Sequence, residues 1–214
     1  RLAKERGLRT LEGHRWGREI FEGFLTWCKK RGVKVITVFG FSSENWNRSK
    51  DEVDYLMDLF ETYLSEPRGV KKFQEGGVRV KIIGQKERLR PSLQKVIKHI
   101  EDVTKENSDF HLNLAVSYGG KWDIAQAVQQ IVREGIRADE IGEETIAQRL
   151  STAGLPDPDL IIRAGGEKRL SNFVLWQGAY AELYFCPKYW PDFTEQDLQE
   201  AFEEYARRSR RFGH

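Results

Sequence analysis

Short β-branched segments alternate with longer segments of helical periodicity along the whole chain. The clearest case is the apolar run 33–39, which precedes a polar loop at 40–50 and a helical pattern over 51–64. The same patterns predict strands at 78–83, 110–116, 160–163 and 181–185, and helices at 17–31, 91–105, 121–134, 143–150 and after Thr194, where Asp197 completes a capping-box variant. The alternation indicates βαβ units, so we expect an α/β fold with a mainly parallel sheet flanked by helices.

Length and composition favour a single domain over residues 1–214. The chain has 214 residues, of which 39% are hydrophobic and 32% charged, with no repeat or low-complexity linker. Together with a mean hydropathy of −0.61, these values exclude a disordered chain and a membrane-spanning protein. The longest stretch without a charged residue, 170–181, has 12 residues, fewer than the ~20 that cross a bilayer as a helix. We find no signal peptide at the start of the chain.

Cysteine and histidine usage favours a cytoplasmic protein without zinc. Cys28 and Cys186 lie far apart with no paired spacing, as is typical of proteins in a reducing compartment. The 4 histidines form no metal-ligand pattern.

Charge is unevenly distributed. The net charge is only +2, which argues against a surface built as a whole to bind nucleic acid. Residues 1–18 nevertheless carry six basic and two acidic side chains, and the segment 206–212 carries four arginines. A solvated basic face and an anion-binding site are both open interpretations of the N-terminal excess.

The loop after the first strand combines unusual side chains. Residues 40–48 hold small polar groups, an amide, an indole and a guanidinium. Ligands of parallel α/β sheets bind at the carboxyl ends of strands, where this loop lies. Turn hydrogen bonds from Ser42 or Ser43, and cover of the sheet edge by Trp46, are the structural alternative.

A second loop, at 162–172, favours a diphosphate ligand. Arg163, Lys168 and Arg169 surround the pair Gly165-Gly166, and Ser171 follows. Charge-assisted hydrogen bonds contribute about 1.5–3 kcal/mol each, so three or four donors suffice for useful affinity. Arginine matches phosphate oxygens in pairs. An exposed basic turn is the alternative, and the loop is neither a phosphate-binding P-loop nor a dinucleotide GxGxxG motif.

Glu182 is the one charged residue between 170 and 185. A carboxylate in such apolar surroundings needs a partner, which is either an arginine of the same fold or a metal ion. Magnesium bound to a diphosphate takes only one or two protein carboxylates, so a single glutamate is compatible with that role.

Together the loops resemble the cis-prenyltransferases, polyprenyl synthases of the undecaprenyl diphosphate synthase type. The resemblance covers nearly the whole chain, in blocks whose order and spacing are specific: Gly13-His14-Arg15, Phe41 to Arg48 with Glu52, Asn113 to Trp122 with Asp123, Ile162 to Phe173, Trp176 to Phe185, Trp190 to Phe193, and Arg210 to Gly213.

The resemblance implies a homodimeric enzyme that condenses isopentenyl diphosphate with an allylic prenyl diphosphate, using Mg²⁺, to form a cis-polyprenyl diphosphate. It implies that isopentenyl diphosphate is bound by Arg163, Arg169 and Ser171, and that Glu182 helps to hold magnesium near that site. A long apolar product suggests a cytoplasmic enzyme with peripheral contact at the membrane surface.

The remaining roles implied by the resemblance concern the other substrate. Ser42, Asn45 and Arg48 match catalytic positions, with Ser42 and Asn45 associated with removal of the proton. The expected allylic substrate-binding residues are Arg1, Arg9, His14, Trp46 and Glu52.

The sequence departs from the family at its start. The opening motif Asp-Gly-Asn-x-Arg is represented only by Arg1, so we expect the first strand and the motif aspartate to precede the given chain. Ala164 and Lys168 replace a threonine and a histidine that are common in the family. Two alternatives stay open: a non-catalytic partner subunit of a two-component synthase, and a nucleic-acid-binding protein.

Overall fold

The computed structural model describes residues 10–208, with only the backbone given for 10–16 and 18. These residues form two compact units: unit 1 comprises 10–33, 157–170 and 177–208, and unit 2 comprises 34–156 and 171–176. The single domain expected over 1–214 stays a prediction.

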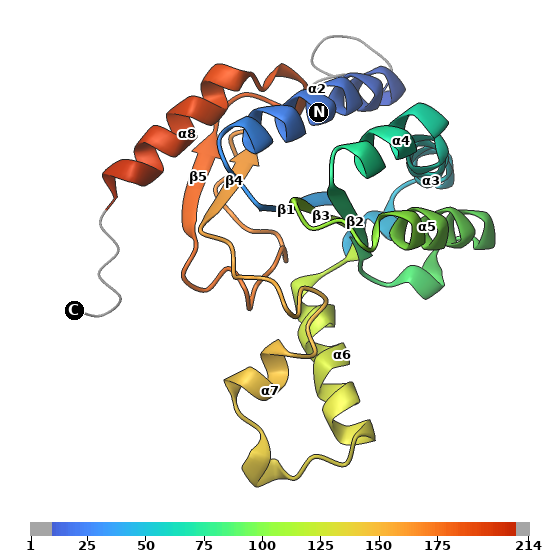
Figure 1. Cartoon of the computed structure of the whole chain (residues 1–214), viewed down its shortest axis with the longest axis vertical. Helices are drawn as coiled ribbons and strands as arrows, with labels where there is room; N and C mark the ends of the chain where they lie inside the picture. The colour runs from blue at the N-terminus through green and yellow to red at the C-terminus, as the bar shows by residue number, and fades with distance from the viewer. Residues whose placement is uncertain (1–9, 209–214) are drawn as a thin grey trace. The chain divides into compact units, whose positions relative to one another are not determined.

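Helices and strands alternate along the chain, as the sequence predicts (Figure 1). The strands are β1 (Val35–Ser42), β2 (Val78–Ile83), β3 (Phe110–Tyr118), β4 (Leu160–Ala164) and β5 (Glu182–Cys186). The α-helices are α2 (Thr10–Lys30), α3 (Lys50–Ser65), α4 (Pro67–Glu75), α5 (Pro91–Thr104), α6 (Gly120–Arg133), α7 (Glu143–Ala147) and α8 (Glu195–Arg207). The 3-10 helices are η1 (Ser43–Asn47), η2 (Lys86–Arg88), η3 (Ala138–Glu140) and η4 (Trp190–Asp192). Within 10–208, no helix has the length and apolar character needed to cross a membrane.

Unit 2 is built on a parallel sheet with the strand order β1-β3-β2. Leu112 of the central strand β3 pairs with Ile36 on one side and Val80 on the other. β3 is buried continuously from Leu112 to Tyr118. A strand with neighbours on both edges and helices on its faces needs such a continuous buried run. The predicted parallel α/β architecture is thereby confirmed.

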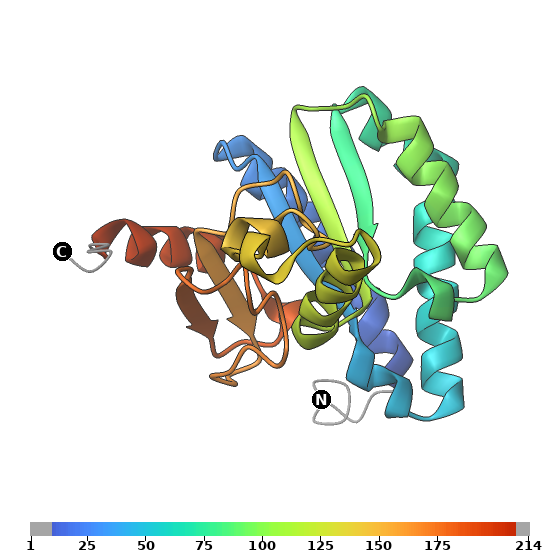
Figure 2. The same ribbon diagram turned by 90° about the horizontal axis from the view of Figure 1, so that it is seen from below.

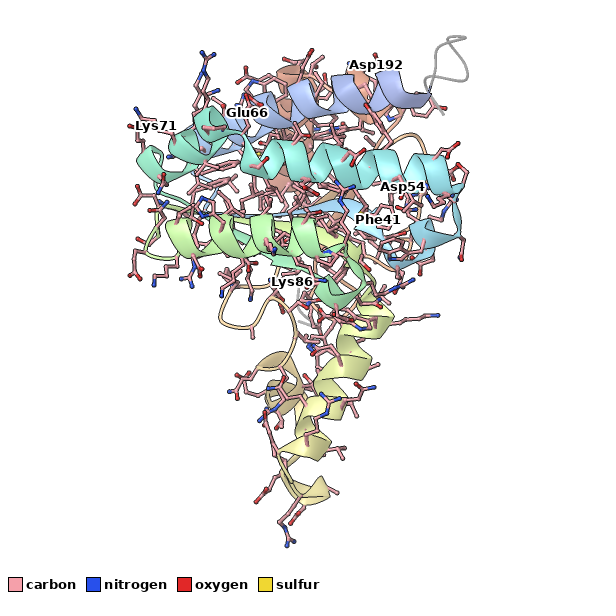
Figure 3. The ribbon with its side chains drawn as sticks, turned by 90° about the vertical axis from the view of Figure 1, so that its right-hand side faces the viewer. Phe41, Asp54, Glu66, Lys71, Lys86 and Asp192 are labelled. Atoms are coloured by element: carbon pink, nitrogen blue, oxygen red, sulfur yellow. The ribbon has the colours of Figure 1, made fainter. Side chains whose placement is uncertain are left out.

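Helices α3, α4 and α5 pack together, and α4 and α5 contact β2. Figures 1 and 2 show this layer on one face of the sheet of unit 2, and Figure 3 shows α3 and α5 side by side. Helix α4 was not predicted from the sequence. This helix begins at Pro67 and buries only Phe73, so it has no repeated apolar stripe from which to predict it.

The prediction of a polar loop at 40–50 was wrong for residues 40–42, which belong to a strand. β1 continues to Ser42, and η1 follows directly. The pairing of β1 with β3 is irregular around Phe39 and Phe41, where Gly40 lies close to the ring of Phe60. A Cβ atom at Gly40 would lie 3.0 Å from that ring, so a glycine allows the strand to continue past it. The helix expected at 143–150 also ends early, at Ala147.

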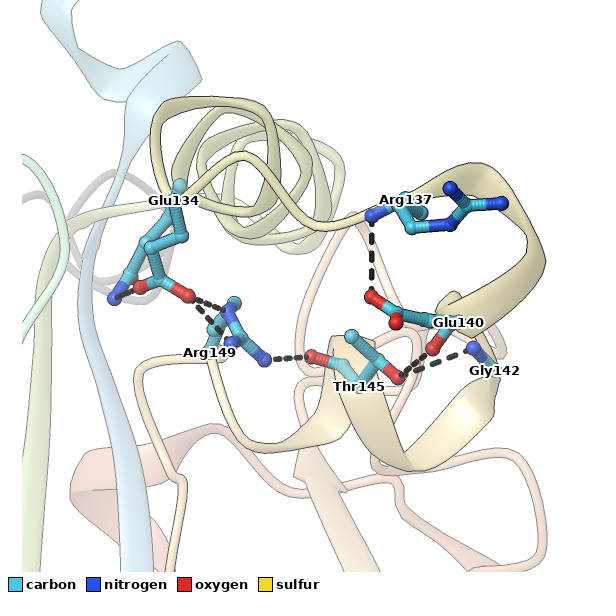
Figure 4. A network of polar contacts seen from close by, with 7 residues as sticks. Glu134, Arg137, Glu140, Gly142, Thr145 and Arg149 are labelled. Atoms are coloured by element: carbon cyan, nitrogen blue, oxygen red, sulfur yellow. Dashed lines mark hydrogen bonds and ion pairs between the residues drawn. The ribbon is translucent and has the colours of Figure 1, made fainter.

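Polar contacts join α6 to α7 in unit 2 (Figure 4). Arg149 donates to Glu134 Oε2 from Nε at 2.8 Å and to the carbonyl of Thr145 at 2.7 Å. The Thr145 hydroxyl donates to the carbonyl of Glu140 and accepts the N–H of Gly142. These bonds hold the connection between the two helices.

Unit 1 combines the parallel pair β4–β5 with α2 and α8. The predicted capping box is confirmed, because Thr194 accepts the N–H of Asp197 and Asp197 accepts that of Thr194. Arg31 at the end of α2 binds Glu195 of α8 at 2.8 Å. The ring of Phe24 packs edge-on against Trp190, so long-range contacts attach both helices to the same unit.

Candidate active site

The carboxyl ends of β1, β3 and β2 meet at one edge of the sheet in unit 2, because the three strands are parallel. Ser42 pairs with Tyr118 at this edge. The turns that follow these strands therefore lie together, as expected for a ligand site in an α/β sheet. This edge carries Ser42, Asn45 and Trp46 of the predicted site.

A side-chain hydrogen bond shapes the turn after β1. The backbone N–H of Ser42 donates to Asn45 Oδ1 at 3.0 Å. Partial desolvation disfavours the charged form of Glu44, but hydrogen bonds from Asn172, its own backbone, Ser42 and Ser43 outweigh it and hold the pKa of the carboxyl below its ordinary value. The amide of Asn45 and the carboxylate of Glu44 therefore both take part in fixing this turn.

Trp46 is held from three sides. Its indole N–H donates to Ser117 Oγ at 2.8 Å, and its ring packs edge-on against Phe41 with centroids 5.1 Å apart. The guanidinium of Arg88 lies 5.0 Å from the indole centroid, within the range of a cation–π interaction. The indole position is therefore fixed at the same edge as Ser42.

Arg48 and Glu52 form an ion pair at 2.7 Å. Arg48 is the C-cap of η1 and Glu52 lies in the first turn of α3. An exposed pair one helical turn apart stabilises the fold by only about 0.3–0.5 kcal/mol. Its main effect is to orient the Arg48 guanidinium, which stays exposed.

Asn172 connects the loop at 171–176 to the rest of this edge. Its Nδ2 donates to Glu44 Oε1 at 2.8 Å, and its Oδ1 accepts the N–H of Lys121 at 2.9 Å. Its carbonyl accepts the N–H of Gly120 at 2.6 Å. Ser171, predicted to bind isopentenyl diphosphate, is the exposed preceding residue. The structure thus places Ser171 on the same unit as Ser42 and Asn45.

Arg163 and Arg169 are brought together in unit 1. Arg163 lies near the end of β4, and its guanidinium donates to the carbonyl of Arg169. The loop turns at Gly165 and Gly166, whose φ values of 102° and 72° favour glycine. Arg169 also binds the carboxylate of Glu167. A diphosphate would compete with that carboxylate for the exposed guanidinium.

Glu182 has an arginine partner in unit 1. Arg208 donates to Glu182 Oε2 at 2.7 Å, which is one of the two alternatives that the sequence left open. Glu182 begins β5 and pairs with Leu160, whereas Arg163 pairs with Phe185. Glu182 therefore lies three residues along the strand direction from the level of Arg163, which corresponds to roughly 10 Å. The magnesium role of Glu182 stays a prediction.

The other predicted site residues are not placed. Arg1 and Arg9 lie outside the described residues, and His14 belongs to α2 with only its backbone described. Within 10–208, no three His, Cys, Asp or Glu residues are grouped so as to hold a metal ion. A magnesium ion bound mainly by diphosphate oxygens and water does not require such a group.

Four residues that shape the edge were not predicted from the sequence, namely Glu44, Arg88, Ser117 and Asn172. Each acts through a long-range contact that no local pattern reveals. The available signal was the pair Gly119-Gly120, because adjacent glycines allow close approach of another segment. A Cβ atom at Gly119 would lie 2.6 Å from both Asn172 Nδ2 and Ser43 Oγ.

The fold and these groups define an α/β protein whose loops offer cationic and hydrogen-bonding groups suited to a phosphorylated ligand. Hydroxyl, amide and indole groups lie at the carboxyl edge of the sheet in unit 2. In unit 1, Arg163 at the end of β4 donates to the carbonyl of Arg169 in the loop that follows. Residues 1–213 match the family described as "Putative undecaprenyl diphosphate synthase". The chain belongs to this family and is a prenyltransferase.

Known relatives agree with this assignment. An isoprenyl transferase of Aquifex aeolicus is 44% identical over 213 residues, which are 100% of this chain and 90% of the relative. A ditrans,polycis-undecaprenyl-diphosphate synthase of Aliivibrio fischeri, named as (2E,6E)-farnesyl-diphosphate specific, is 46% identical over 217 residues, covering 100% of this chain and 84% of the relative.

Solved structures show the same fold. Lavandulyl diphosphate synthase from Lavandula x intermedia, in complex with dimethylallyl diphosphate, matches with a TM-score of 0.93 and 41% identity over 100% of this chain and 93% of that one. A probable undecaprenyl diphosphate synthase from Campylobacter jejuni matches with a TM-score of 0.83 and 33% identity over 93% of this chain and 92% of that one.

Proposed function

We propose that the protein condenses isopentenyl diphosphate with an allylic prenyl diphosphate and forms a cis-polyprenyl diphosphate. The observation that carries this proposal is the 46% identity, over 100% of this chain, with a synthase named for undecaprenyl diphosphate and farnesyl diphosphate. Farnesyl diphosphate is therefore the first primer to test. The loops described above supply groups that suit both diphosphates.

The proposed reaction breaks the bond between the allylic carbon and its diphosphate oxygen. The double bond of isopentenyl diphosphate supplies the electron pair for the new carbon–carbon bond, and loss of a proton restores a double bond. Positive charge develops on carbon and negative charge on the leaving diphosphate. Fixed cationic donors therefore stabilise the transition state more than the ground state.

In this proposal Arg163, Arg169 and Ser171 bind isopentenyl diphosphate. The hydrogen bond from Arg163 to the carbonyl of Arg169 supports a preformed loop, which lowers the entropy lost on binding. Ser42 and Asn45 serve the proton-removal step, and the hydrogen bond from the Ser42 N–H to Asn45 Oδ1 keeps the two residues together.

Arg48, oriented by Glu52, faces the reacting groups together with Trp46. We assign binding of the allylic substrate to Trp46 and Glu52. On the family resemblance, we assign it also to Arg1, Arg9 and His14.

We propose Mg²⁺ as the cofactor and Glu182 as one of its ligands. Magnesium would neutralise charge on the diphosphate groups when bound. Glu182 fits this role through its carboxylate, which must exchange the guanidinium of Arg208 for the ion. Both side chains of this pair keep partial contact with solvent, which allows such an exchange.

A homodimer, a cytoplasmic location and peripheral membrane contact complete the proposal. They are supported by the family resemblance and by the apolar character of a polyprenyl product. Sedimentation analysis tests the dimer, and flotation with phospholipid vesicles tests the membrane contact.

The test of the proposed function is incorporation of radiolabelled isopentenyl diphosphate into organic-soluble product. The assay uses Mg²⁺ with farnesyl or geranylgeranyl diphosphate, and mass analysis gives the product length. We expect products longer than the primer by multiples of five carbons. Absence of product with every primer would reject the enzyme and favour a non-catalytic partner subunit, which then requires a second chain for activity.

The second candidate function is a reaction of dimethylallyl diphosphate that does not use isopentenyl diphosphate and does not elongate a long chain. The structural match to lavandulyl diphosphate synthase has a TM-score of 0.93 with dimethylallyl diphosphate bound in that protein. A reaction containing dimethylallyl diphosphate alone separates the two candidates. Product formed without isopentenyl diphosphate would favour the second candidate, whereas dependence on isopentenyl diphosphate would favour chain elongation.

Nucleic-acid binding is tested by retention of labelled DNA and RNA at low and high salt. Affinity that falls steeply with salt would support that alternative, and we expect no retention.

A further inference from the structure

Asn172 makes three hydrogen bonds to two other segments of unit 2. It contacts Glu44 of η1 and the N–H groups of Gly120 and Lys121 at the start of α6. We propose that Asn172 is a positioning residue that holds the turn of Ser42 and Asn45 at a set distance from Ser171. This inference rests on the proposed function and adds a residue to which the family resemblance gave no role.

The backbone of Asn172 explains the choice of residue. Its φ of 65° lies in the left-handed region, and Ser171 before it has a φ of 50°. Asparagine tolerates this conformation better than most residues that carry a side chain. Its amide also combines a donor with an acceptor. Asn172 uses the acceptor for Lys121 and the donor for Glu44, so both ends of the amide are engaged.

The facing segment is shaped to receive this side chain. A Cβ atom at Gly119 would lie 2.6 Å from Asn172 Nδ2, and one at Gly120 would lie 2.8 Å from Leu175 Cγ. Side chains at either position would push the loop at 171–176 away from α6. The two glycines therefore permit a close fit between the loop and the start of the helix.

The contacts continue from Asn172 to the predicted catalytic turn. Glu44 Oε1 accepts a hydrogen bond from Asn172 Nδ2, and Glu44 lies in η1 between Ser42 and Asn45, which are joined by the bond from the Ser42 N–H to Asn45 Oδ1 at 3.0 Å. Glu44 thus relays the position of Asn172 to Ser42. Loss of the Asn172 amide would release Glu44 and loosen the turn that places Ser42 and Asn45.

Asn172→Asp is the decisive variant. Aspartate tolerates the left-handed conformation and keeps an acceptor for Lys121, but it places a second carboxylate against Glu44 in place of a donor. We expect kcat to fall about tenfold or more, with little change in KM for the allylic substrate. Glu44→Gln alone should cost about threefold or less, because the glutamine carbonyl still accepts from Asn172.

The double variant Asn172→Asp with Glu44→Gln restores a hydrogen bond with its direction reversed. The glutamine amide then donates to the aspartate, and we expect kcat to return to within about threefold of the wild type. A residue that served only stability would not show this recovery of kcat. Thermal unfolding of all three variants checks that they fold.

Asn107→Asp provides the matched control. Asn107 also donates from Nδ2 within unit 2, to the carbonyls of Phe73 and Val78 at 3.1 and 2.9 Å, away from the site. We expect it to lower the melting temperature without lowering kcat, and Glu44→Gln should not rescue it.

The outcomes separate this inference from the proposed function. A folded Asn172→Asp variant with wild-type kcat would overturn the positioning role, and so would a folded double variant no more active than Asn172→Asp. Both results require an active wild type, so they leave the proposed function standing. A wild type that forms no prenyl product would instead overturn the proposed function and this role together.

Discussion

Ser117 is the second-to-last residue of β3 and has a φ of 55°. Its fully buried hydroxyl accepts the indole N–H of Trp46 at 2.8 Å. Two variants separate the hydrogen bond from the backbone conformation. Ser117→Ala removes the bond and keeps the Cβ atom in the left-handed region. Ser117→Gly removes the same bond and also the Cβ atom that makes this conformation unfavourable.

The expected changes in unfolding free energy follow from the lost hydrogen bond and from the backbone conformation at Ser117. A neutral hydrogen bond contributes about 1 kcal/mol, and the left-handed conformation costs a residue with a side chain about 1–2 kcal/mol. Ser117→Ala should therefore lose about 1 kcal/mol of unfolding free energy. Ser117→Gly should stay within about 1 kcal/mol of the wild type, because relief of the backbone offsets the lost bond.

Activity should respond differently from stability. Both variants release the indole of Trp46, so both should lower kcat/KM for the allylic substrate by about fivefold, as 1 kcal/mol implies. The backbone is otherwise held, because Gln85 donates to the Ser117 carbonyl at 3.0 Å.

Thermal unfolding and steady-state kinetics measure the two effects. For a chain of this size, 1 kcal/mol corresponds to a shift of about 2–4 °C in melting temperature. Equal melting temperatures for the two variants would refute the reasoning about the backbone. Wild-type kcat/KM in both would refute the role of Ser117 in holding Trp46.

Three further predictions concern the arginine loop, the carboxylate of β5 and the cap of α8. Arg169→Ala should raise KM for isopentenyl diphosphate at least about tenfold with a smaller effect on kcat, since it removes a charge-assisted hydrogen bond worth about 1.5–3 kcal/mol; an unchanged KM in steady-state assays would reject the assignment. Glu182→Gln should raise the Mg²⁺ concentration needed for half-maximal activity, and an unaltered metal titration would leave the pair with Arg208 as its only role. Asp197 is buried, and although desolvation opposes its charge, hydrogen bonds from Lys188 and Thr194 hold its pKa below the ordinary value. Its stabilisation is therefore present above the unfolded pKa of about 3.9 and is lost as pH falls through the lower folded pKa. Asp197→Asn should lower stability at pH 7 by about 1–2 kcal/mol, and the difference from wild type should shrink in denaturant titrations below about pH 4; a difference independent of pH would contradict this account.

The strand and helix order was predictable from local patterns. Apolar residues recur along β3 because that strand is central and buried, although the polar Asn113 and Ser117 are buried with them. The periodic segments of α3 and α5 place their apolar residues on one face. Helix α4 was not predictable, because it buries only Phe73.

The residue types of the candidate site were also visible in the sequence. Ser42 ends β1, and Asn45 and Trp46 follow it. Arg163 lies near the end of β4, and Arg169 lies in the loop after that strand. A strand followed by a polar loop is a local feature, and in a parallel sheet such loops end at the ligand-binding edge. The resemblance to the prenyltransferase family rested on these same blocks and is confirmed.

The partners of these residues were decided only by the tertiary structure. Glu44 and Asn172 bond across 128 positions of sequence, and Trp46 and Ser117 across 71. Glu182 was isolated among apolar neighbours, yet its arginine partner, Arg208, is 26 positions away. Local periodicity depends on residues three or four positions apart and can be read directly from the sequence. Which distant donor meets which acceptor depends on how the strands and helices pack, because that packing decides which loops come within hydrogen-bonding distance.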